Sequence, residues 1–244
     1  MKLIKTVEVA SVLAAISFML FSCNKEYTQV APLQTNINSL ATVQVINATV
    51  KATRNYIYVD GTAVSGSTLA YGGIFPGTAY AFSVTAGSHS IVIKDTLPTT
   101  TQIPITFTQN LDAGKFYTIF TYDTITSIKQ LTVLNNIIIP ADTTSMLRFA
   151  NFIYNPTSLP NVDVYSFRRG TATPVFTNVA TAQVTDFIPY ASGLIDTLYV
   201  YATGTTTPLI VKQVVSSLTP TRSYTALYSG SFRGTKTVAT FITY

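Results

Sequence analysis

The sequence predicts an all-β protein with two tandem immunoglobulin-like β-sandwich domains, and three observations lead to this. The chain is rich in residues that fit a pleated sheet, with 41 threonines, 15 tyrosines and 14 phenylalanines. Short apolar runs recur at roughly 10-residue spacing between turn residues. The same order of motifs occurs twice, about 107 residues apart, which is the size of one small sandwich.

Three pairs of segments carry this internal repeat, and each segment reads as a short strand. The pairs are 43–47 with 147–151, 56–61 with 162–165, and 115–120 with 222–227. We expect seven or eight strands in each copy, including 62–69 in the first and 181–188 in the second. Asp60-Gly61 is typical of a type I′ hairpin turn, because both central residues of that turn need a positive φ.

The sequence divides into four segments by composition. They are a signal peptide at 1–22, a tether at 23–40, a first sandwich at 41–138 and a second sandwich at 139–244. Pro140–Thr144 interrupts the strand pattern between the two sandwiches. We expect Ile137–Ile139 to form a strand that seals the interface between them.

The N-terminus has the pattern of an exported protein. Lys2 and Lys5 precede a mostly apolar run, Val9–Phe21, of 13 residues. This run is shorter than the roughly 20 residues that span a membrane, and it suits a cleaved signal peptide. Cys23, the only cysteine, follows directly, so no internal disulfide can form and stability must come from packed cores.

The residues around Cys23 resemble a lipobox, in which Leu and small residues precede a lipid-bearing cysteine. Leu20 and Ser22 match this pattern and Phe21 departs from it, a form similar to that of Bacteroidetes lipoproteins. The polar residues after Cys23 read as a flexible tether. The resemblance implies a lipid anchor on the outer membrane, at either the cell surface or the periplasmic face.

The charge pattern argues against a nucleic-acid partner. The whole chain carries a net charge of +5, which falls to +4 without the leader residues Lys2, Lys5 and Glu8. A nucleic-acid-binding surface needs clustered basic residues, and the only adjacent basic pair is Arg168-Arg169. We expect no nucleic-acid partner. The expected partners are the membrane, through the lipid anchor, and a polysaccharide or an envelope protein as ligand.

Beyond the leader, the motifs resemble a known family. Val43–Ala48 (VQVINA), Tyr56–Gly61 (YIYVDG), Gly87–Ile91 (GSHSI) and Tyr117–Phe120 (YTIF) follow the order of the domain-of-unknown-function 4397 family. That family has an Arg near the start of its first strand, where this chain has Gln44. The second copy keeps Arg148 at the matching place. The resemblance implies the β fold and a lipoprotein context, but no catalytic residues.

The sequence offers little for catalysis, metal binding or cofactors. His89, the only histidine, stands in a hairpin turn leading into a strand, so we interpret it as a turn or strand residue. Zinc needs several Cys or His ligands, and no second one is available in the mature chain. Gly72-Gly73 lacks the spacing and the lysine of a phosphate-binding loop. We expect no enzymatic activity, no metal and no cofactor.

Four aspartates are each followed by a threonine and then by an apolar residue or threonine. The threonines are Thr96, Thr124, Thr143 and Thr197. This pattern is similar to the O-glycosylation motif of exported Bacteroidetes proteins, which makes these four candidate modification sites. The alternative is that Asp-Thr pairs simply mark the starts of strands after turns.

Aromatic residues in loops are the remaining candidates for ligand contact. They are Tyr71, Phe75, Tyr154 and Tyr190. Aromatic rings can stack on the apolar face of a sugar, although core or loop packing explains any single ring as well. The sequence therefore predicts a binding or spacer protein. Its alternatives are a fimbrial subunit that assembles by strand donation, with 237–244 as the strand of interest, and a hydrolase with paired carboxylates or His89 in a deep cleft.

Overall fold

The computed structural model describes residues 37–168, 170–215 and 218–244, with no side chain described from 210 to 217. Cys23, the predicted signal peptide and most of the predicted tether lie outside these residues. Within them, regular structure consists of strands and one 3₁₀ turn, η1 (Ile37–Ser39), which confirms the all-β prediction. Residues 37–244 form one compact unit.

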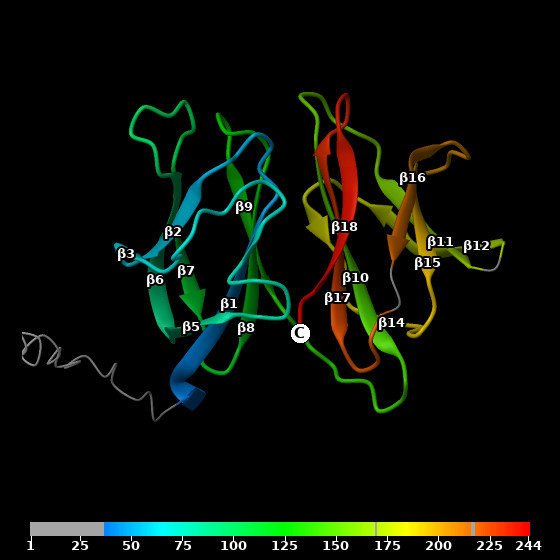
Figure 1. The fold of residues 1–244 in the computed structure, drawn as a ribbon, viewed down its shortest axis with the longest axis horizontal. Coiled ribbons are helices and arrows are strands. Elements are labelled where there is room, and N and C mark those ends of the chain that lie inside the picture. The colour runs from blue at the N-terminus through cyan, green and yellow to red at the C-terminus, as the bar shows by residue number, and fades with distance from the viewer. Residues whose placement is uncertain (1–36, 169, 216–217) are drawn as a thin grey trace, which may run out of the picture. The chain divides into compact units, whose positions relative to one another are not determined.

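The described strands fall into two sets of nine (Figure 1). The first set is β1 (Leu40–Asn47), β2 (Asn55–Val59), β3 (Thr62–Ala63), β4 (Ile74–Phe75), β5 (Phe82–Thr85), β6 (Gly87–Asp95), β7 (Ile105–Leu111), β8 (Phe116–Tyr122) and β9 (Lys129–Leu134). The second set is β10 (Ser145–Tyr154), β11 (Val162–Arg168), β12 (Thr171–Val179), β13 (Gln183–Val184), β14 (Ile188–Tyr190), β15 (Asp196–Ala202), β16 (Pro208–Val215), β17 (Ser223–Ser231) and β18 (Lys236–Ile242).

Both sets are built into an inner and an outer sheet with the same strand order. The first inner sheet is β4-β1-β8-β9 with β5 also paired to β1, and the first outer sheet is β3-β2-β6-β7. The second inner sheet is β13-β10-β17-β18 with β14 on β10, and the second outer sheet is β12-β11-β15-β16. β1 runs parallel to β8, as β10 does to β17. The internal repeat is thus present in the strand order, while the immunoglobulin-like type and the limits 41–138 and 139–244 stay predictions.

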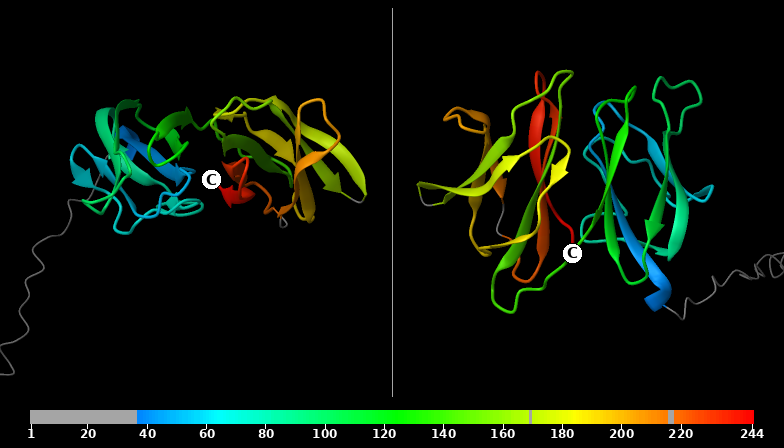
Figure 2. Two further views of the ribbon diagram at one scale, coloured as in Figure 1. Left: turned by 90° about the horizontal axis from the view of Figure 1, so that it is seen from above. Right: turned by 180° about the vertical axis from the view of Figure 1, so that it is seen from behind.

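Each half has its own apolar core between its two sheets, and Figure 2 shows the strands of both halves from two further directions. In the first half, Val45 and Ile119 of the inner sheet meet Ile57 and Ile93 of the outer sheet. In the second half, residues of β10 and β17 meet Val164 of β11 and others of β15. The core covers only one face of each outer sheet, so buried and less buried residues alternate along the outer strands. In β15, every second residue is buried.

The inner sheets differ because both of their faces are covered. A third apolar cluster joins Ile46 and Phe120 of the first inner sheet to Phe152 and Leu227 of the second. The rings of Phe120 and Phe152 stack with centroids 4.7 Å apart. Nine of the ten residues of β10 are therefore buried, without alternation, as expected for a strand covered on both sides.

Arg148 lies in this interface with its side chain fully enclosed. It is 1% exposed and donates from Nε to Thr225 Oγ1 (2.8 Å), from Nη1 to Asn135 Oδ1 (2.7 Å) and from Nη2 to Thr118 Oγ1 (3.2 Å). Its guanidinium lies over the ring of Phe187 at 4.6 Å. Burial lowers the pKa of Arg148 to about 9. Among the described residues, no carboxylate forms an ion pair with it.

Gln44 has the matching place in the first half and makes a different contact. Its Nε2 donates to the carbonyl oxygens of Gly77 and Tyr80, both at 3.2 Å. The loop that it holds reaches the second half, where the Ala79 N–H donates to Ile242 O at 2.9 Å. Both repeats thus use a buried polar side chain at this position to join the halves.

Three strand predictions were wrong. The expected strand 62–69 ends at Ala63, because the hydroxyl of Ser65 accepts the Ile57 N–H (3.0 Å) in place of a carbonyl. The expected strand 181–188 breaks into β13 and β14, because the hydroxyl of Thr185 accepts the Phe149 N–H (2.9 Å). Ile137–Ile139 forms no strand, and Ile138 and Ile139 are more than half exposed. The third apolar cluster covers the interface instead.

Replacing Arg148 by alanine should destabilise the whole compact unit. The change leaves a cavity and removes the hydrogen-bond donors to Asn135 and two threonines. These losses outweigh the free energy gained because a charge is no longer buried. We expect the free energy of unfolding to fall by about 2–3 kcal/mol in urea unfolding. The control Arg222→Ala, at an exposed arginine, should change it by less than about 0.5 kcal/mol. Equal effects of the two changes would refute this role for Arg148.

Candidate binding site

His89 is held by both of its ring nitrogens. It is buried in β6, with Nδ1 2.6 Å from Asp60 Oδ2 and Nε2 2.7 Å from the carbonyl oxygen of Thr85. Both partners are acceptors, so the protonated ring, in which both nitrogens donate, is the form that satisfies both contacts. Burial opposes this charge, but the hydrogen bonds to Asp60 and Thr85 outweigh it and raise the pKa of His89. His89 therefore has no free nitrogen with which to act as a base.

Asp60 belongs to the predicted hairpin turn. The φ angles of Asp60 (+49°) and Gly61 (+80°) are both positive, which confirms the expected turn geometry. The hydrogen bond from His89, followed by that from the Ser90 N–H, lowers the pKa of Asp60. The pair thus ties the β2–β3 turn to the start of β6.

The four aspartates of the Asp-Thr pairs all accept backbone N–H groups. The acceptors and donors are Asp95 with Leu97, Asp123 with Thr124, Asp142 with Thr144, and Asp196 with Thr197. These contacts give the pairs a structural role in turns. Thr96 and Thr143 are exposed, whereas Thr124 and Thr197 are half-buried. Glycosylation of the four threonines stays a prediction.

The four predicted contact aromatics lie in different places. The hydroxyl of Tyr71 hydrogen-bonds to that of Ser229 (3.0 Å), and Phe75 packs on Phe82 against the first core. Tyr190 is 7% exposed and donates to Asp196, and burial raises the pKa of its hydroxyl to about 12. Tyr154 is half-buried and lines a hollow, so the structure brings these four rings to no common site.

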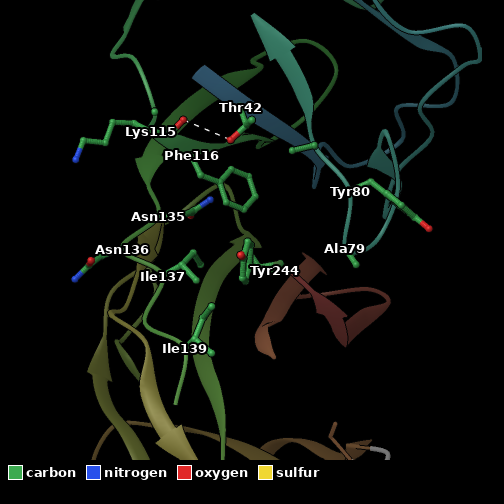
Figure 3. A pocket seen from close by; sticks show the side chains of 13 residues that line it. Thr42, Ala79, Tyr80, Lys115, Phe116, Asn135, Asn136, Ile137, Ile139 and Tyr244 are labelled. Carbon is green, nitrogen blue, oxygen red and sulfur yellow. Dashed lines mark hydrogen bonds between the residues drawn. The ribbon is translucent and has the colours of Figure 1, made fainter. Parts of the chain in front are cut away.

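Two hollows lie between the inner sheets and their loops. One, of about 570 Å³, is lined by Phe116, Ile137, Tyr244 and others (Figure 3). Asn135 also lines this hollow, but its side-chain oxygen already accepts a hydrogen bond from Arg148. The other, of about 470 Å³, contains Tyr154. Its two charged residues, Asp123 and Lys129, form an ion pair at 2.8 Å.

A third hollow, of about 690 Å³, lies on the outward face of the first outer sheet. It is lined by Tyr56, Tyr58, Lys94, Asp95, Thr96, Leu97, Pro98, Thr100, Gln102 and Pro104. We call it the tyrosine groove. Tyr56 and Tyr58 face outward because Ile57 and Val59, which alternate with them, are buried. Lys94 pairs with Tyr56 across the sheet and places Nζ 4.7 Å from the ring centroid of Tyr58.

Asp95 fixes the loop that walls the tyrosine groove. Its carboxylate accepts two hydrogen bonds from Arg54, both at 3.1 Å, and others from the Leu97 N–H and the Thr100 hydroxyl. Burial opposes the charge, but these donors outweigh it and hold the pKa of Asp95 at about 2. These four hydrogen bonds to one carboxylate thus fix the wall through contacts within the protein.

The second outer sheet carries four more aromatic rings on its outward face, which we call the aromatic ladder. They are Tyr165 and Phe167 of β11 and Tyr199 and Tyr201 of β15. Tyr165 meets Tyr201 edge-on at 5.2 Å, and Phe167 meets Tyr199 edge-on at 5.6 Å. Phe167 is 40% exposed and the three tyrosines are partly exposed.

Sequence reasoning missed both aromatic surfaces, although the signal was present. In Tyr56-Ile57-Tyr58-Val59, buried aliphatics at alternate positions force the tyrosines to the other face. Leu198-Tyr199-Val200-Tyr201 repeats the pattern. The aromatic rings of both surfaces lie within strands, whereas the predicted ligand contacts were assigned to loops.

The described part of the chain shows no metal site and no membrane-spanning helix. Within it, no three His, Cys, Asp or Glu side chains gather where they could hold a metal ion. In the same residues, no helix is long and apolar enough to cross a membrane.

The His89–Asp60 pair should make stability depend on pH. The pKa of His89 is raised from 6.5, so its contribution is complete below about pH 6.5 and is lost as pH rises through the higher folded value. The pKa of Asp60 is lowered from 3.8, so its contribution is lost only in acid. His89→Gln should therefore lower the melting temperature more at about pH 5.5 than at about pH 9. Asp60→Asn should do the same, and a loss independent of pH would contradict the pairing.

Comparison with known proteins gives one family. The chain matches none of the curated proteins. Residues 41–165 match the model of the family described as Domain of unknown function (DUF4397), a span that runs from the second residue of β1 to the fourth residue of β11. The match covers half of the chain and agrees with the resemblance in its motifs. The chain therefore belongs to the DUF4397 family.

Proposed function

We propose that this protein is a lipid-anchored, non-enzymatic binding protein of the cell envelope, and that its ligand is a polysaccharide held in the tyrosine groove. Cys23 carries the lipid and fixes the protein to the outer membrane. The residues after it, up to the first strand, serve as the tether. The compact unit 37–244 then presents the groove to polymers of the envelope.

The chemistry of the tyrosine groove carries this proposal. Two tyrosine rings stand two residues apart on one strand, about 7 Å, so that both face the same side of the sheet. Among the described residues their hydroxyls have no hydrogen-bond partner, so they are free for a ligand. Sugars need flat apolar surface together with hydroxyl or charged groups at its rim, and the hydroxyls of Tyr56 and Tyr58 and the ammonium of Lys94 supply these.

Two features favour binding over the other candidate functions. Strand donation requires a strand that is free in the monomer, but β18 pairs with β17 over seven residue pairs. Catalysis by His89 requires a free ring nitrogen, and both nitrogens are bound to Asp60 and Thr85. A protein ligand in place of a polysaccharide is the alternative that the experiment below separates.

Removal of the groove tyrosines should weaken polysaccharide binding. For a chain that begins at residue 24, we expect Tyr56→Ala/Tyr58→Ala to weaken binding about 10- to 30-fold in affinity electrophoresis, since each stacked ring contributes about 1 kcal/mol. The control Tyr80→Ala removes a ring that is 69% exposed and lies outside the groove, and should bind as the unchanged chain does. Capture of a discrete protein with no glycan binding would overturn the proposed ligand.

Loss of the anchor residue should release the protein from membranes. Cys23→Ala removes the sulfur to which lipid is attached, so the protein should move from the membrane fraction to the soluble fraction of the envelope. Metabolic labelling with a fatty acid should mark the unchanged chain and leave the variant unlabelled. Unchanged membrane retention in the variant would refute the anchor.

A further inference from the structure

The order of the sheets leaves two broad faces open on opposite sides of the compact unit. The first core joins the outer and inner sheets of the first half, the third cluster joins the two inner sheets, and the second core joins the sheets of the second half. The layers are therefore outer, inner, inner, outer. The outward faces of the two outer sheets point away from each other, separated by three sheet-to-sheet spacings of about 10 Å each.

Aromatic rings occupy both of these faces. The first carries the tyrosine groove on β2 and the second the aromatic ladder on β11 and β15. These strands hold equivalent places in the repeat, because β2 pairs with β6 as β11 pairs with β15. The same kind of surface thus recurs at the same place of the fold.

Two described charged side chains near the ladder are already held by other groups of the protein. Asp163 accepts the Asn178 N–H (2.7 Å) and the Thr203 hydroxyl (2.9 Å). Arg168 turns to Asp196 at 2.9 Å. The hydroxyls of Tyr165, Tyr199 and Tyr201 have no partner among the described residues. Among the described residues, the ladder thus offers ring faces together with tyrosine hydroxyls that have no protein partner, a combination that suits a sugar chain.

We propose that the aromatic ladder is a second carbohydrate-binding platform, so that one chain bridges two strands of a neutral, unbranched polysaccharide. This rests on the proposed function of the tyrosine groove. One polymer strand cannot lie on both platforms without turning around the molecule, because the platforms face opposite ways. Each chain therefore holds two strands, and its lipid anchor ties the cross-link to the membrane.

A capture assay tests this bridging. The mature chain with Cys23→Ala is mixed with beads that carry a polymer and with the same polymer labelled with fluorescein. The probes are hydroxyethylcellulose, pullulan and glycol chitin, which are neutral and soluble. We expect the protein to bind the beads and to hold labelled polymer on them. Tyr199→Ala/Tyr201→Ala should still bind beads through the groove but lose at least tenfold of the captured label.

Matched variants separate the outcomes. Tyr56→Ala/Tyr58→Ala should also lose capture, and Tyr80→Ala should keep it. Each variant is compared by thermal unfolding, and Tyr199→Phe/Tyr201→Phe, which keeps the rings, should retain most of the capture. Bead binding without capture by the unchanged chain overturns the bridge alone, whereas no binding to any of the three polymers overturns the proposed function with it.

Two further results would overturn the platform itself. Capture that survives in the Tyr199→Ala/Tyr201→Ala variant means that the ladder is not the second platform. A dimer of the unchanged chain in light scattering, lost in that variant, means that the ladder contacts a second copy instead of sugar.

Discussion

Arg148 sets the condition under which the two halves can pack. A guanidinium without a carboxylate partner among the described residues is costly to bury, and it is accepted here because Thr118, Asn135 and Thr225 take its hydrogen bonds while Phe187 covers its plane. Two of these acceptors come from the first half and one from the second. The charge is therefore satisfied only when the inner sheets are in contact, so interface and arginine depend on each other.

That contact decides which surfaces remain for function. Both faces of the inner sheets are buried, by a core on one side and by the third apolar cluster on the other. The side chains of the inner sheets are therefore buried within the protein and are not available to a ligand. The outward faces of the outer sheets have no such cover, so aromatic rings placed there meet solvent. The two aromatic surfaces follow from the same packing that encloses Arg148.

The sequence was sufficient for the all-β class, the repeated strand order and most strands, because β-branched residues and regular turns mark them. It failed where a side chain replaces a backbone partner, as Ser65 and Thr185 do, since propensity describes the strand and not its hydrogen-bond partner. It failed at Ile137–Ile139 because apolar character was taken for burial. The wall of the tyrosine groove could not be predicted, because it depends on Asp95 and Arg54, which are 41 residues apart in the sequence and meet only in the fold.

Cross-strand aromatic pairs stabilise sheets by themselves, and this must be weighed against a binding role. It accounts for the contacts of Tyr165 with Tyr201, which need no ligand. It does not account for the loop beside Tyr56 and Tyr58, where four donors of Arg54, Leu97 and Thr100 converge on one carboxylate. Asp95 gathers these donors and holds the loop away from the rings, so that a hollow of about 690 Å³ stays open. The proposed ligand of the tyrosine groove therefore rests on this hollow and its fixed wall, and not on the aromatic pairs alone.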